Sequence, residues 1–481
     1  MKTEIVIRYI GHVLLFCAIF MGISASISAI YHETSFIPLL FSALITALLG
    51  LFPMVFVKRT DTINSMEGLM IVVFGWLAAC LTGMLPFMMW GGEFHPVNAW
   101  FESVSGFTTT GSSILTEIES LPRGLLFWRS ATHWLGGMGV ILFALLILPQ
   151  ASVMKVILLH TEISTLAKAN FAYRARKTLQ ILALVYIGLT LLETILLTLF
   201  GMSIFDAVNH SFATIATGGF STRNNSVATF GSISIEVIIM AFMLISGIHF
   251  GLIFQTVTLN RKSNIFRSTL ARNYLLFIFA GILLVTAKLW ADGMYDLKDS
   301  LRYGAFQVIS LGTTTGFATA DTNPWPFFTQ IILIYFTIQC AMAGSTSGGL
   351  KFDRVFIFLK SIGRQMKQIR HPRAVFTTTI DGKVIDASME SMVTIFIGSY
   401  MLILLISTIG LSLFDIDLFS AFTASAATLG NVGPGFNRVS SLGNFANLPS
   451  PAKLILTINM ILGRLEIFGI FTILFARSWR K

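Results

Sequence analysis

The sequence predicts an all-α polytopic membrane protein with four tandem helix–pore-loop–helix repeats around one pore, preceded by two extra transmembrane helices. Composition is the first reason, because 54% of the 481 residues are hydrophobic, 12% are charged and the mean hydropathy is +0.78. Soluble domains carry about 25% charged residues. The second reason is an internal repeat: a short stretch rich in threonine and glycine occurs four times, each time between apolar segments.

The four stretches define loops one to four, and each contains a marker glycine. The loops are 105–113, 215–221, 312–317 and 430–436, with marker glycines Gly111, Gly218, Gly316 and Gly433. Glycine permits positive φ angles, which can turn successive carbonyl groups toward an axis. Such carbonyls, together with threonine hydroxyls, can replace the hydration shell of a monovalent cation. One such stretch would indicate only a turn, but four in phase predict a cation filter.

The distribution of basic residues indicates the orientation in the membrane. Most of the 33 lysines and arginines fall on alternate connections that would share one face. This is the positive-inside bias of a cytoplasmic face, and it predicts that both termini are cytoplasmic. The net charge of +10 is therefore accounted for without a nucleic-acid partner.

The first unit, 1–60, is expected to contain two helices outside the repeat. Residues 9–30 form an apolar run, and 36–57 supply a return span that ends at Lys58 and Arg59. Small residues near the end of the first run resemble a signal cleavage region, but the run is long for a signal peptide. We therefore expect both helices to be retained.

Each repeat is predicted to contain an apolar span, a shorter segment, a loop and a second span. The units are 61–150, 178–260, 270–352 and 391–481, with a basic cytoplasmic segment at 353–390. The first spans are 67–90, 178–200, 273–291 and 391–413; the short segments are 95–107, 203–215, 296–311 and 415–428; the second spans are 124–148, 231–255, 326–350 and 452–475. A crossing needs about 20 apolar residues, so the short segments cannot span the bilayer.

Half-length helices with irregular backbone at membrane depth are tolerated where they line a water-filled cavity, so the short segments and loops are interpreted as re-entrant pore loops. Asp206, Asp296 and Asp415 stand near the starts of short segments two to four, where they could cap helix N-termini. The negative C-terminal ends of these helices would then point inward and favour a cation.

Several motifs resemble those of the TrkH/TrkG/KtrB potassium-uptake proteins, and the length is more similar to the TrkH branch. The motifs are FESVSGFTTTG at 101–111, WR at 128–129, HWLGGMG at 133–139, GMSIFDA at 201–207, ATGGFST at 216–222, AGSTSGGLK at 343–351 and GRLE at 463–466. The resemblance covers essentially the whole chain.

The resemblance implies K⁺ as the transported ion, a bacterial inner (cytoplasmic) membrane, a homodimer with a pore in each protomer, and a cytosolic TrkA-type nucleotide-binding regulatory subunit. No nucleotide is expected on this chain, since no Walker A or GxGxxG motif opens a helix after a strand. The family's filter positions correspond here to Thr109, Thr110, Gly111, Ala216, Thr217, Gly218, Thr314, Thr315, Gly316, Asn431, Val432 and Gly433. Loop four contains no threonine and is the weakest match.

A gate is expected where small residues interrupt the second span of repeat three. The expected gating residues are Gly344, Ser345, Thr346, Ser347, Gly348, Gly349, Lys351 and Arg464. Glycine in a helix costs about 0.8–1 kcal/mol relative to alanine, so this span is predicted to be broken. The alternative is close helix packing through small residues. Arg464 is expected to face the pore just below the filter, and the alternative is an intramembrane ion pair with Glu466 or another carboxylate.

Two other classes of function compete with a pore. An ion-coupled (H⁺ or Na⁺) secondary cation transporter is the alternative, but such transporters often have inverted repeats, whereas these repeats all start and end inside. An enzyme is not expected, because the spans contain no convergent set of catalytic Asp, His or Ser residues.

Overall fold

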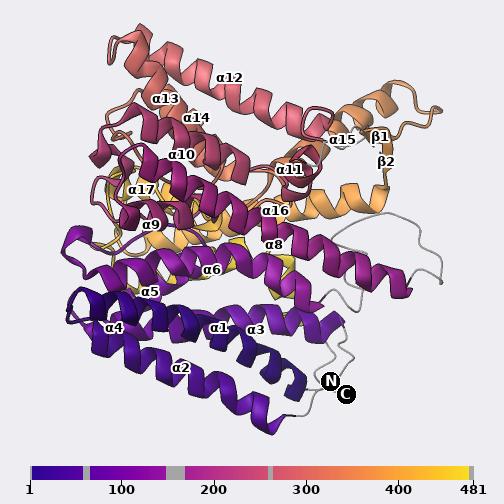
Figure 1. Ribbon diagram of the computed structural model, residues 1–481. Coiled ribbons are helices and arrows are strands. Elements are labelled where there is room, and N and C mark those ends of the chain that lie inside the picture. Colours follow the sequence, from indigo (N-terminus) through magenta and orange to yellow (C-terminus); the bar gives the residue numbers. More distant parts are fainter. Residues whose placement is uncertain (1–2, 58–64, 148–167, 258–263, 476–481) are drawn as a thin grey trace.

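The computed structural model describes residues 3–57, 65–147, 168–257 and 264–475, and it is mostly helical (Figure 1). Six helices among these residues are long and apolar enough to cross a membrane, or seven if one bent pair counts as a single span. The prediction of a polytopic helical membrane protein is therefore confirmed. Long helices run side by side, and a small hairpin, β1 (Thr378–Ile380) and β2 (Lys383–Ile385), lies at one end of the bundle.

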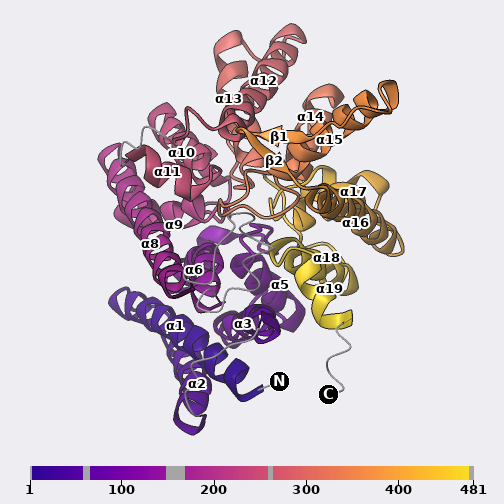
Figure 2. The same ribbon diagram turned by 90° about the vertical axis from the view of Figure 1, so that its right-hand side faces the viewer.

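The first two helices, α1 (Thr3–Ile30) and α2 (Phe36–Phe56), pack as an antiparallel pair at the edge of the molecule (Figure 2). Their backbones approach closely, since a Cβ atom on Gly11 would lie 2.6 Å from the Gly50 carbonyl oxygen. The Arg8 guanidinium donates to the Met54 and Val57 carbonyls at the end of α2. The pair contacts the first repeat through both helices: α1 packs on α3 and α6, and α2 packs on α4.

The remaining helices form four successive groups. The first group contains α3 (Ser65–Gly83), α4 (Leu85–Trp90), α5 (Pro96–Phe107) and α6 (Arg123–Ile147), and the second contains α8 (Lys168–Leu199), α9 (Ile204–Ile215), α10 (Ile233–Ser246) and α11 (Phe250–Val257). The third group contains α12 (Thr269–Ala291), α13 (Leu297–Gly312), α14 (Phe327–Gln339) and α15 (Phe352–Arg370). The fourth group contains α16 (Ala387–Ser412), α17 (Leu418–Leu429), α18 (Ser450–Arg464) and α19 (Phe468–Phe475). Figure 2 shows these groups following one another around a common centre.

Two spans predicted as continuous are broken, so the sequence prediction was wrong there. The second span of repeat two bends by 106° between α10 and α11. The second span of repeat four ends at Arg464, because Glu466 has a φ of 49° and its carbonyl accepts the Gly469 N–H at 2.7 Å. The basic segment 353–390 contains most of α15 and the two-stranded hairpin, a small addition to a fold that is otherwise all-α as predicted.

Side-chain caps begin three of the four short helices. Asp296 caps α13 as predicted, whereas Ser203 caps α9 and Asp417 caps α17. Asp206 and Asp415 were therefore wrong as caps. Burial alone would raise the pKa of Asp417, but hydrogen bonds from the Ser420 N–H and the Asn437 amide, with the charge of Arg438, lower it. The cap thus stays an ionised acceptor at the N-terminal end of its helix.

Candidate ion pathway

The four loops have the same backbone geometry. In each, a residue with positive φ is followed two positions later by a glycine with positive φ. These pairs are Thr109 (53°) and Gly111 (84°), Thr217 (54°) and Gly219 (76°), Thr314 (63°) and Gly316 (80°), and Asn431 (53°) and Gly433 (100°). A non-glycine residue held in this region costs about 1–3 kcal/mol and persists only where its surroundings impose it. The structure imposes it four times at equivalent places.

This geometry corrects the register of loop two by one residue. The three residues from the positive-φ residue to the glycine form the triplet of each loop, and in loop two this triplet is Thr217, Gly218 and Gly219. Ala216, which was assigned to the filter from the sequence, directly follows α9 and still has a helical φ of −75°. Hydrogen bonding agrees with this register. The middle residue of every triplet donates its N–H to the carbonyl five residues earlier, at Thr110, Gly218, Thr315 and Val432, over 2.8–2.9 Å.

The loops meet in a closed ring. A Cβ atom built on the glycine of one loop would collide with the middle carbonyl oxygen of the next loop. The pairs are Gly111 with Gly218 O (2.1 Å), Gly219 with Thr315 O (2.0 Å), Gly316 with Val432 O (2.1 Å) and Gly433 with Thr110 O (2.6 Å). Because the order runs from loop one through two, three and four and back to one, the four middle carbonyls surround a single axis. Only glycine fits at these positions.

The first residue of each triplet adds a second layer of oxygen atoms. The hydroxyls of Thr109 and Thr314, and the side-chain oxygen of Asn431, are buried and have no hydrogen-bond partner among the residues that the structure describes. The Thr217 hydroxyl donates to the carbonyl of Ala216 at 2.7 Å. Buried oxygens without donors are uncommon in proteins, and here they come from equivalent positions of three loops.

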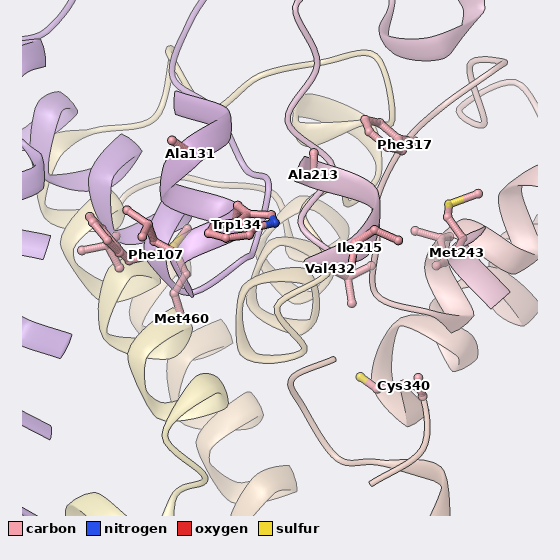
Figure 3. Close-up of a cluster of buried hydrophobic side chains, with 14 of the residues drawn as sticks. Phe107, Ala131, Trp134, Ala213, Ile215, Met243, Phe317, Cys340, Val432 and Met460 are labelled. Atoms are coloured by element: carbon pink, nitrogen blue, oxygen red, sulfur yellow. The ribbon is translucent and has the colours of Figure 1, made fainter. Parts of the chain in front are cut away.

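Four short helices end immediately before the ring. The last residues of α5, α9, α13 and α17 are Phe107, Ile215, Gly312 and Leu429, each four positions before the loop glycine. The C-terminal end of a helix carries about half a negative charge. Four such ends converging on one place make the centre of the molecule favourable for a cation. Apolar side chains from all four groups, including Phe107, Ile215, Cys340, Val432 and Met460, pack around these ends (Figure 3).

Below the ring, α14 ends at Gln339 and α15 begins only at Phe352. We call residues 340–351 the inner segment. The break in the second span of repeat three therefore starts at Cys340, before the glycine-rich residues 344–349 from which it was predicted. The Thr346 hydroxyl donates to the carbonyl of Ile215 at 3.0 Å, and a Cβ atom on Gly348 would lie 2.2 Å from the Asn431 side-chain oxygen. The inner segment therefore lies directly against loops two and four.

The bend between α10 and α11 is explained by the same segment. The N–H of Met342 donates to the carbonyl of Gly247, and the N–H of Phe250 donates to the carbonyl of Gly344, both over 3.1 Å. These two bonds use backbone groups that a continuous helix would need for itself. Tertiary hydrogen bonds thus replace the helical ones, and the sequence signal for the break is the pair Ser246–Gly247 next to a polar histidine.

Arg464 is buried and anchors the inner segment. Its guanidinium donates to the carbonyl of Thr346 over 2.5 Å and to the carbonyl of Gly136 in α6 over 2.8 Å. No carboxylate among the described residues forms an ion pair with it. The ion-pair alternative for Arg464 is therefore contradicted, and the arginine bridges repeats one, three and four instead.

Glu466 has other partners. Its carboxylate pairs with the guanidinium of Arg354 at 2.6 Å and lies 4.0 Å from the Nζ atom of Lys351. Lys351 is itself buried and has a φ of 65°, so it ends the inner segment in a strained conformation. The two charged residues of the GRLE motif thus contact the inner segment at different places. Arg464 binds Thr346 in its middle, and Glu466 lies at its junction with α15.

Six or more helices long and apolar enough to cross a membrane, around a closed ring of four loops, define a polytopic membrane transport protein. The family model described as TrkH, cation transport protein, matches residues 39–480. The potassium uptake protein TrkH of Halomonas elongata is 35% identical over 87% of each chain, and that of Escherichia coli K12 is 36% identical over 88% of each. The crystal structure of the potassium transporter TrkH from Vibrio parahaemolyticus superposes with a TM-score of 0.90 and 30% identity over the whole of both chains.

The chain belongs to the TrkH family of cation transport proteins. The resemblance seen in the motifs is thereby confirmed, as is the expectation that the protein is not an enzyme.

Proposed function

We propose that this protein takes up K⁺ across the inner membrane of a bacterium, through a filter made of the triplets that begin at Thr109, Thr217, Thr314 and Asn431. The observation that carries the proposal is the closed ring of carbonyls with buried, unpartnered oxygens beside it, as judged over the described part of the chain. K⁺ can lose its water only where oxygens replace it at similar strength. The names of the relatives, potassium uptake proteins, agree with this ion.

The inner segment is proposed as the gate, opened from the cytosol by a TrkA-type nucleotide-binding subunit. Its residues Thr346 and Gly348 lie against loops two and four, and Arg464 holds Thr346 there. The inner segment continues directly into α15, which forms the first part of the basic region at 353–390, so a partner bound on that region could pull on the gate. We also propose a homodimer with one pathway in each protomer and with the termini in the cytosol.

The test is cation flux in liposomes that contain the purified protein, with K⁺ or Na⁺ as the only permeant ion. K⁺ flux should exceed Na⁺ flux, and adding the regulatory subunit with a nucleotide should change the K⁺ flux. Equal flux of both ions would contradict a potassium filter. Light scattering in detergent should give twice the chain mass of 53.0 kDa, and a monomer mass would contradict the dimer.

A second candidate, transport coupled to H⁺ or Na⁺, is favoured by Glu193. This glutamate lies in α8, is fully buried, and neither carboxylate oxygen has a hydrogen-bond partner within the described ranges. The hydroxyl of Thr214, which is close by, already donates to the carbonyl of His210 at 2.8 Å. Intramembrane carboxyls often belong to proton pathways. K⁺ uptake that an inward H⁺ gradient accelerates in the wild type but not in Glu193→Gln would establish coupling, and the absence of any such effect in the wild type would refute it.

A further inference from the structure

The helices that follow loops one to four, which are α6, α10, α14 and α18, differ at their seventh residue. That residue is apolar and fully buried in three of them and is an arginine, 2% exposed, in the first. The residues are Arg129 in α6, Ile239 in α10, Leu333 in α14 and Leu456 in α18. Removing a guanidinium from water costs several kcal/mol unless charge and hydrogen bonds compensate it. The buried arginine at this one of the four positions must therefore be stabilised by specific partners.

Arg129 connects the first two repeats behind the ring. Its Nε atom donates to the Glu102 carboxylate at 2.5 Å, and its Nη1 atom donates to the carbonyl of Ser221 at 2.9 Å. The guanidinium carbon also lies 3.6 Å from the centre of the Phe220 ring. Phe220 and Ser221 directly follow Gly219, so Arg129 holds the outgoing end of loop two.

Glu102 holds the outgoing end of loop one. Its carboxylate accepts the Ser113 hydroxyl at 3.0 and 3.1 Å and the Ile114 N–H at 3.1 Å, and it is fully buried. Ser113 lies two positions after Gly111, as Ser221 lies two positions after Gly219. The pair Glu102–Arg129 thus joins the same point of two neighbouring loops through four hydrogen bonds and one ion pair.

The equivalent positions of the other repeats carry no charge and form no ion pair, although the His210 ring stacks on Phe317 of loop three with ring centres 5.6 Å apart. Nine positions before the loop glycine, His210 bonds to the Ser221 hydroxyl at 2.9 Å, and Gln307 donates to the carbonyl of Ala320 at 3.1 Å. In the fourth repeat this position is Ala424, which has no polar side chain. Among these, only Glu102 is charged and linked to a neighbouring loop. Among the described residues, the charged brace therefore joins loops one and two, whereas loops four and one are linked by uncharged groups such as Asn431 and Thr110.

We propose that Glu102 and Arg129 are a positioning pair that sets the spacing of loops one and two and so determines the cation selectivity of the ring. The inference rests on the proposed filter. Neither side chain belongs to the triplets, so the pair acts through the carbonyls of Thr110 and Gly218 by fixing the chain that follows them. A ring whose loops drift apart would fit K⁺ less well and would discriminate less against the smaller Na⁺.

Four variants test the pair through the K⁺/Na⁺ flux ratio in liposomes. Glu102→Gln leaves a positive charge behind the ring, and Arg129→Met leaves a negative one, so any direct electrostatic effect on flux has opposite signs. A lost brace lowers the ratio in both, by about tenfold, which corresponds to about 1.4 kcal/mol. In the double variant the two losses should not add, because the residues act as one unit. Glu236→Gln is the matched control: it removes an ion pair of 2.6–2.7 Å with Arg302, between α10 and α13.

The results separate this inference from the proposed function. A wild type that does not prefer K⁺ contradicts the filter itself. A selective wild type with an unchanged ratio in folded Glu102→Gln and Arg129→Met overturns the positioning role, and so does an equal loss in the Glu236→Gln control. If the charged variants do not fold, Ser113→Ala removes the two hydroxyl contacts to Glu102 and leaves the ion pair intact. It should lower the ratio less than tenfold, and an unaltered ratio refutes the inference.

Discussion

Replacing Gly316 by serine should damage selectivity through a defined collision. The added Cβ atom would lie 2.1 Å from the carbonyl oxygen of Val432, so that oxygen must retreat by about 0.9 Å to reach 3.0 Å, the lower end of real Cβ contacts. Val432 O is one of the four ring carbonyls. A shift of this size weakens its interaction with a bound cation, and a hydrogen bond to a charged group is worth about 1.5–3 kcal/mol. Losing half of that, about 0.75–1.5 kcal/mol, lowers the K⁺/Na⁺ flux ratio by roughly four- to twelvefold.

Backbone strain must be separated from the collision. Gly316 has a φ of 80°, and a side chain in this region costs about 1–2 kcal/mol wherever it occurs. Gly293, in the same repeat, has a φ of 68° and no heavy atom within 4 Å of the place that a Cβ atom would occupy, so Gly293→Ser carries the strain alone. Flux ratios in liposomes and thermal unfolding should be measured for both. Equal ratios in folded Gly316→Ser and the wild type, or an equal loss in Gly293→Ser, would refute the reasoning.

Two further predictions concern the inner segment. Deleting residues 344–349 should raise basal flux, because the chain beneath the ring is removed, and it should make flux less dependent on the cytosolic subunit; wild-type flux from the folded variant would argue against a gate there. Arg464→Ala should also raise flux while the K⁺/Na⁺ ratio stays the same, because two hydrogen bonds of about 1.5–3 kcal/mol each, to Thr346 O and Gly136 O, are lost and the ring is untouched. A slower variant, or one with an altered ratio, would show that the arginine supports the ring and not the segment.

Hydropathy and the repeat were enough to predict the helix order, because apolar length and Thr/Gly loops are local properties of the sequence. The start of α9 was expected at residue 203 and lies at Ile204, and α5 was expected to end at Phe107 and does. The register of loop two could not be predicted from the sequence, because the loops were aligned on a glycine and both Gly218 and Gly219 meet that criterion. The structure decides between them through the carbonyl of Thr315, which leaves no room beside Gly219.

Partners of buried charges were the part that the sequence could not supply. A carboxylate partner for Arg464 was plausible because opposite charges attract, yet its acceptors are two backbone carbonyls from distant parts of the chain, one in the inner segment and one in α6. Every residue has a carbonyl, so no pattern marks the ones that will accept. The Glu102–Arg129 pair was missed for a related reason: both residues stand inside family-like motifs, and a spacing of 27 residues across a loop carries no periodic signal.

Loop four departs from the threonine pattern at Asn431, and its contacts explain the departure. The Asn431 amide donates to the Thr110 hydroxyl at 3.0 Å and to the carbonyl of Met460 at 2.9 Å, so it ties loop four to loop one and to α18. Its oxygen lies against Gly348 of the inner segment, where even a Cβ atom would collide. A threonine hydroxyl, one bond shorter, could not make both donor bonds while presenting an oxygen downward. The residue that looked weakest as a filter position is thus the one at which the ring and the inner segment touch.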